Sequence, residues 1–192
     1  MRIFLFNMLV MGMLLYGAEL YGYKKRKEVE KVQIRYLKRT LRINIRSPEY
    51  IVLEETKREK IGIRTGIRTW RFEEGVREGD GRKLVKECLK EKESVRIQTK
   101  SSEERQEYRN KNGIGIRGAQ LRRERGVEII EELRMRDFQV QQQVQYNKVQ
   151  KSKFNQRYTY ISTMQLPEYL KVEGKPTDQK LIPPVRCGSL EY

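Results

Sequence analysis

The stretch MRIFLFNMLVMGMLLYGAELYG, residues 1–22, is the one long apolar run in the chain. Such a run at an N-terminus is typical of a cleaved signal peptide, a membrane span or a buried helix. Arg2 and the apolar residues after it suit a signal peptide. Bulky Tyr16 and Leu20, however, lie three positions before the two candidate cleavage points, where a small residue is needed. The run is too short for a span, so a buried helix and a signal peptide remain as alternatives from this stretch alone.

Outside this run the chain is rich in charge and poor in apolar residues. Of its 192 residues 37% are hydrophobic and 35% are charged, and the net charge is +16. Soluble domains usually hold about 45–50% apolar residues. We therefore expect a mostly α fold of extended, loosely packed helices with disordered segments and without a complete globular core. The positive charge favours a polyanionic partner, either nucleic acid or an anionic membrane surface.

Several kinds of chemistry lack the residues that they need. The chain has no histidine and two cysteines, Cys88 and Cys187, which excludes histidine-based triads and leaves too few ligands for a zinc site. The acidic doublets, among them 54–55 and 73–74, have Lys or Arg nearby, and we interpret them as solvated ion pairs. The G-x-G-x-x-G pattern at 113–118 follows a polar stretch instead of a hydrophobic strand, so it predicts a loop. We expect no enzyme activity, cofactor or metal site.

Residues 24–46 carry the strongest binding signal, with ten basic and two acidic residues. Four of the basic residues recur at steps of four, three and four, which places them in one stripe on a helix. The members of this predicted basic ridge are Lys31, Arg35, Lys38 and Arg42. We expect the ridge to face phosphates while the apolar sides of the helix lie in a protein groove. The alternative is a basic face that is merely solvated.

Two further segments predict contact with nucleic acid. The tandem Gly-Ile-Arg-Thr repeat at 62–69 predicts a helix with Arg64, Arg68 and Arg71 on one face. Residues 151–160, KSKFNQRYTY, interleave basic and aromatic side chains. That pattern suits stacking on a single strand and equally suits aromatic packing.

Local patterns also predict caps, loops and buried side chains. Ser47 before a proline predicts a helix start, with the helix running to about residue 60. Trp70 and Cys88 are expected on apolar faces. The glycines of 75–81 predict a loop, and the prolines within 183–188 predict an extended, irregular end.

Five motifs follow one another along nearly the whole chain: LFN at 5–7 with LLYGAE at 14–19, EVEKVQ-x-RYL at 28–37, SPEYIV-x-EETKR at 47–58, RTG at 64–66 with WRFEE at 70–74, and LPEYL at 166–170 with RCG at 186–188. This series resembles the region that follows the catalytic palm in reverse transcriptases of non-LTR, LINE-type retrotransposons. Copies in ant and other hymenopteran genomes are the most similar. The resemblance implies that the apolar run at residues 1–22 is a thumb helix.

The resemblance implies a catalytically inactive fragment, the thumb and C-terminal connector. The fingers, the palm with its metal-binding aspartates, the endonuclease and the cysteine-histidine knuckle have no counterpart in the sequence. The implied function is non-specific binding of RNA or DNA backbone inside the cell, in the nucleus or cytoplasm, with the missing palm as a further partner. We expect the apolar run to pack on the basic helix and to stay partly exposed. The residues expected in this contact are Leu5, Met8, Leu9, Leu15 and Tyr16.

The same interpretation divides the chain into four regions: a thumb-like helical region at 1–93, a polar glycine-containing linker at 94–120, a charged helix or helices at 121–165 and an irregular tail at 166–192. The alternative function is a secreted or membrane-associated basic protein with a signal peptide at 1–18. A helical scaffold that binds an acidic protein is a third interpretation.

Overall fold

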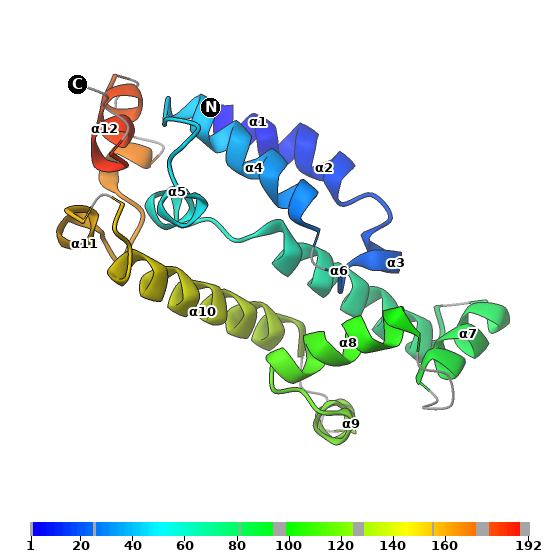
Figure 1. Ribbon diagram of the computed structural model, residues 1–192. Coiled ribbons are helices and arrows are strands. Elements are labelled where there is room, and N and C mark those ends of the chain that lie inside the picture. Colours follow the sequence, from blue (N-terminus) through cyan, green and yellow to red (C-terminus); the bar gives the residue numbers. More distant parts are fainter. Residues whose placement is uncertain are drawn as a thin grey trace. The chain divides into compact units, whose positions relative to one another are not determined.

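The computed structural model describes residues 2–24, 26–80, 82–93, 99–124, 129–154, 156–171 and 177–188. These residues form helices and turns without a β-strand, which confirms the expected mostly α fold (Figure 1). The elements are α1 (Arg2–Leu5), η1 (Phe6–Val10), α2 (Met11–Leu14), α3 (Ala18–Tyr21), α4 (Lys27–Thr40), α5 (Glu49–Thr56), α6 (Ile61–Gly75), η2 (Val76–Asp80), α7 (Lys83–Glu93), α8 (Lys100–Lys111), α9 (Ile116–Glu124), α10 (Ile129–Gln150), α11 (Tyr158–Ile161), η3 (Glu168–Leu170) and α12 (Asp178–Arg186).

The chain forms two compact units, each drawn from separated parts of the sequence. Unit 1 comprises Met1–Leu14, Lys27–Lys60 and Gln139–Tyr192, and unit 2 comprises Leu15–Arg26 and Ile61–Phe138. Both units take residues from the region expected at 1–93. Helices α8 and α9 occupy much of the segment expected to be a linker, and α12 lies in the segment expected to be an irregular tail.

In unit 1 the apolar run packs on the basic helix, because α1, η1 and α2 lie along α4 (Figure 1). Phe6 makes the central contact, with its ring centroid 4.6 Å from that of Tyr36, and Met11 is buried as well. Leu5, Met8 and Leu9 were expected to make this contact while staying partly exposed, and all three are exposed. The buried residues are Phe6 and Met11 instead, and the other two expected residues, half-buried Leu15 and exposed Tyr16, belong to unit 2. The helical turn directs Phe6 and Met11 inward, since they lie on a different face from their three exposed neighbours.

The core of unit 1 surrounds α5, whose Ile51, Val52 and Leu53 are all buried. The apolar cluster of this unit consists of Leu37, Leu41, Ile43, Ile51, Val52, Val149, Tyr158 and Cys187. Ser47 was expected to cap α5, but Pro48 occupies the N-cap position, without a side-chain hydrogen bond. The helix also ends earlier than expected, at Thr56, because Lys57 adopts a left-handed conformation with φ 48°.

In unit 2 the tandem repeat forms α6, as expected, and its threonines join α6 to α3. The Thr65 hydroxyl donates to the carbonyl of Gly22 at 3.1 Å, and the Thr69 hydroxyl donates to the carbonyl of Ala18 at 2.6 Å. One helical turn separates the two threonines, so the repeat places both hydroxyls on one face. Trp70 is buried as expected, in the apolar cluster formed by Trp70, Tyr108, Ile114, Ala119, Ile129 and Leu133.

Three local predictions were wrong. Cys88 on α7 is exposed, whereas Cys187 is buried. Residues 75–81 were expected to be a loop, but α6 reaches Gly75 and η2 follows it to Asp80, with a kink at Gly79, where φ is 121°. Residue 81 lies outside the described residues. Pro183 and Pro184 lie inside α12, because Cys187 at its end is held in the core of unit 1 and tertiary packing outweighs the helix-breaking tendency of proline.

Candidate nucleic-acid interface

The basic ridge lies on α4, whose ends carry the charges that a helix dipole favours. Glu28 and Glu30 lie in the first turn, and Lys38 and Arg39 lie in the last. The buried face of α4 includes Ile34 and Leu37, whereas exposed basic residues occupy a neighbouring part of the helix surface. Lys31 and Arg35 of the predicted ridge are exposed, so these two meet the expectation of surface cations.

The inclusion of Lys38 in the ridge was wrong. Its ammonium donates to the carbonyls of Ile45 and Ser47, at 2.7 and 2.6 Å, and the residue is buried. Burial lowers the pKa of Lys38, and the nearby Glu49 partly opposes that shift. Lys38 lies at the border of the buried face of α4, so it holds the following loop in place instead of meeting a phosphate.

Arg42 is exposed, but it lies beyond the end of α4 and does not continue the helical stripe. Its φ of 56° places it in the left-handed conformation, which at the end of a helix is usually adopted by glycine. The amide of Ile43 donates back to the carbonyl of Lys38 at 2.9 Å and closes this helix end. Arg42 is therefore a surface cation on a turn of less favourable backbone geometry.

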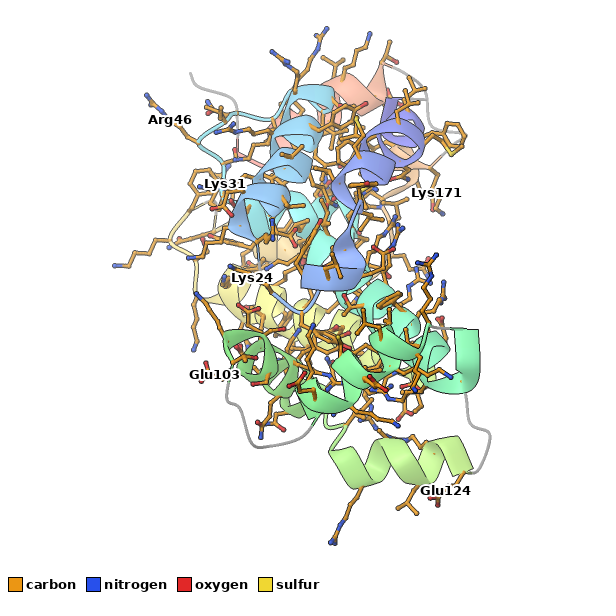
Figure 2. The ribbon with its side chains drawn as sticks, turned by 90° about the vertical axis from the view of Figure 1, so that its right-hand side faces the viewer. Lys24, Lys31, Arg46, Glu103, Glu124 and Lys171 are labelled. Atoms are coloured by element: carbon orange, nitrogen blue, oxygen red, sulfur yellow. The ribbon has the colours of Figure 1, made fainter. Side chains whose placement is uncertain are left out.

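The structure shows a row of cations that is more regular than the predicted basic ridge. Four exposed residues follow one another at steps of four along α4, and we call them the exposed ridge: Lys27, Lys31, Arg35 and Arg39. None of the four forms an ion pair within the part of the chain that the structure describes. Lys31 projects outward, as does Arg46 in the loop before α5 (Figure 2). Repetition at intervals of four was the signal that would have found Arg39.

The three arginines expected to bind on α6 belong to unit 2 and have unequal surroundings. Arg68 pairs with Glu19, whose pKa is lowered by a hydrogen bond from its own backbone and further by this arginine. Arg64 is half-buried and already engaged, whereas Arg71 is exposed. Of this predicted set, Arg71 retains the clearest surface position.

The aromatic residues of the segment at 151–160 also differ in their surroundings. Tyr158 lies in the core of unit 1, which matches the packing alternative. Tyr160 is 89% exposed, and Phe154 is exposed and lines a surface groove together with Tyr50. Within this segment Tyr158 packs in the core, whereas Phe154 and Tyr160 are exposed to solvent.

The doublet at 54–55 was wrongly interpreted as a solvated ion pair, because Glu55 is only 1% exposed. Its carboxylate accepts a hydrogen bond from the Tyr158 hydroxyl at 2.7 Å and from Arg186 Nε at 2.6 Å, and it also accepts from Tyr169. Burial, with the charge of Glu55, raises the pKa of Tyr158. The carboxylate is thus occupied by partners from the C-terminal part of the chain.

Glu73 has an equivalent role in unit 2, where the doublet at 73–74 was also expected to be solvated. The residue is buried and accepts from Arg105 Nη2 at 2.7 Å and from the Tyr23 hydroxyl at 3.1 Å. Burial raises the pKa of Tyr23, and the charge of Glu73 adds to that shift. Both carboxylates therefore join segments of the fold, and neither has a second carboxylate bonded to it in the described chain.

Within the described residues, no group of three histidines, cysteines or carboxylates could hold a metal ion. No described helix has the length and apolarity needed to cross a membrane. Comparison with protein-family models, with curated proteins and with solved structures gives no match to this chain. The candidate interface thus rests on the arrangement of the residues themselves.

Proposed function

We propose that this chain binds the backbone of RNA or DNA without sequence specificity, through the exposed ridge of α4. In this proposal it acts as a catalytically inactive segment, like the region after the palm of a non-LTR retrotransposon reverse transcriptase. The observation that carries it is the row of four exposed cations on one helix face, without described ion pairs, in a chain of net charge +16. The sequence resemblance supports the same function.

Binding of a nucleic-acid backbone through the exposed ridge should weaken as the salt concentration rises. Each cation that neutralises a phosphate releases counterions, and on duplex DNA the logarithmic slope is about −0.9 per contact. If the ridge makes four contacts, its share of the slope is about −3.6. Binding through the ridge should then weaken by roughly 10²-fold between 50 and 200 mM salt.

The test is fluorescence anisotropy with a labelled duplex and a labelled single strand over a series of salt concentrations. A variant with glutamine at all four ridge positions should bind more weakly at low salt and show a shallower dependence on salt. On the duplex, the change in the logarithmic slope should approach the value expected for four phosphate contacts. The matched control removes the same charge at four exposed basic residues on or next to α7: Arg82, Lys83, Lys90 and Lys92. Absence of wild-type binding at low salt, or equal slopes for ridge and control variants, would contradict the proposal.

A protein surface such as a polymerase palm is the second partner that we propose. Side chains of the apolar run stay exposed in unit 1, at Phe4, Met8, Leu9 and Met13. An exposed apolar face of this kind is typical of an interaction site. N-terminal sequencing of the protein from cells separates this proposal from the secreted alternative, which requires loss of roughly the first 18–22 residues.

A further inference from the structure

A groove of about 760 Å³ lies in unit 1, at the C-terminal end of α10, the turn that follows it and the start of α5. Three exposed lysines line it: Lys148, Lys151 and Lys153. The aromatic rings of Tyr50 and Phe154 form other parts of its wall. No carboxylate lines the groove among the residues that the structure describes, so the charged side chains in its wall are all cations.

The two aromatic residues are linked through Ser152. The Tyr50 ring packs against the apolar cluster of unit 1, and its hydroxyl is hydrogen-bonded to the Ser152 hydroxyl. Ser152 Oγ also accepts from the Phe154 amide and donates to the Phe154 carbonyl, at 3.0 Å each. These bonds support the turn that carries Phe154, whose ring is partly exposed to solvent.

The dipole of α10 accounts for part of this arrangement. Cations near a helix C-terminus are favourable, which explains Lys148 and Lys151 without a ligand. It does not explain Phe154, an apolar ring left 36% exposed beside the lysines. A ligand with a flat apolar face and adjacent negative charge matches both features.

We propose that the groove binds an unpaired nucleotide of a single strand, with its base stacked on Phe154 and its flanking phosphates next to Lys151 and Lys153. Base stacking on aromatic side chains is tolerant of sequence and requires a base that is free of its complement. This inference rests on the proposed function and adds a preference for unpaired bases to it.

The test compares two labelled oligonucleotides of equal length at low salt, a single-stranded oligothymidylate and an abasic strand with the same backbone. The full chain should bind the oligothymidylate about 5- to 150-fold more tightly, the range expected for stacking of a base. Phe154→Ala should remove this preference and leave the affinity for the abasic strand within about twofold, since stacking does not involve the backbone. Phe154→Trp should restore the preference. Tyr160→Ala, an exposed aromatic residue that does not line the groove, is the matched control and should retain it.

Equal affinity of the wild type for both strands, or an unchanged preference in Phe154→Ala, would overturn the inference and leave backbone binding intact. Failure of the wild type to bind either strand at low salt would instead reject the proposed function, and the inference with it. Circular dichroism of Phe154→Ala establishes that the helices are retained.

Discussion

Replacement of Glu55 by leucine should open the C-terminal part of unit 1. The change leaves Arg186 and the Tyr158 hydroxyl without the carboxylate that both contact. Removal of one member of a buried ion pair costs about 3–5 kcal/mol, because the remaining charge stays desolvated. Typical domains are stable by about 5–15 kcal/mol, so the loss is a large part of the total.

Cys187 provides a local assay for this opening. It is fully buried, follows Arg186 directly and belongs to the apolar cluster next to Glu55. In a Cys88→Ser background it is the remaining thiol, because the chain has two cysteines. If labelling occurs through a rapidly reclosing open state, a loss of about 3–5 kcal/mol should speed it by about 150- to 4,000-fold.

Glu54→Gln is the matched control, since Glu54 adjoins Glu55 and pairs with Lys57 in a partly exposed i,i+3 contact. A pair of this kind contributes about 0–1 kcal/mol, so labelling of Cys187 should change by less than about fivefold. An increase of less than tenfold in Glu55→Leu, with its helix content retained, would refute the stabilising role assigned to Glu55.

Three further changes have defined outcomes. Arg42→Gly should raise the free energy of unfolding by about 0.5–1 kcal/mol in urea denaturation, because glycine adopts the left-handed conformation without strain; a loss of stability would contradict this. Gly66→Ala should lower the free energy of unfolding by about 1–3 kcal/mol, since the added Cβ would meet the Tyr108 ring. Gly75→Ala adds a Cβ to open space and should change the free energy of unfolding by less than about 0.5 kcal/mol. Similar losses in the two variants would refute the close contact at Gly66. Burial raises the pKa of Cys187 from 9.0 to about 12, so its stabilising contribution is present below pH 9 and is lost as pH rises toward 12. The loss amounts to at most about 1.4 kcal/mol of unfolding free energy per pH unit. Cys187→Ala should therefore make the unfolding free energy less dependent on pH between pH 9 and 10, and an unchanged dependence would contradict the raised pKa.

Helix positions could be predicted from the sequence because they depend on neighbours in the chain. The repeat at 62–69 predicts α6, and the charge pattern of 24–46 predicts α4, since both signals recur within one or two turns. The burial of individual cations could not be predicted in the same way. Lys38 and Arg39 are adjacent and chemically alike, yet their directions differ by about 100° on the helix. Only the loop that reaches Lys38 with two carbonyls decides which of them is buried.

The carboxylates Glu55 and Glu73 show the same limit more strongly. Each lies in a doublet with nearby basic residues, a local pattern typical of solvated pairs. The partners that bury Glu55 are 103 to 131 positions away in the chain. No local period carries that information, and the helical conformation of Pro183 and Pro184 depends on the same distant contacts.

Each unit thus contains an apolar cluster and a buried carboxylate that accepts hydrogen bonds from tyrosine and arginine. Such polar contacts between distant segments matter more in a chain that is 37% hydrophobic, because fewer apolar contacts are available. A buried ion pair often stabilises no more than apolar residues of similar size would, yet breaking one is costly. We therefore expect Glu55→Leu combined with Arg186→Met to recover much of the stability lost in Glu55→Leu alone, because no unpaired charge remains. Thiol labelling of Cys187 in the Cys88→Ser background measures the recovery. Labelling as fast in the double variant as in Glu55→Leu would instead mean that the carboxylate stabilises unit 1 through its tyrosine partners.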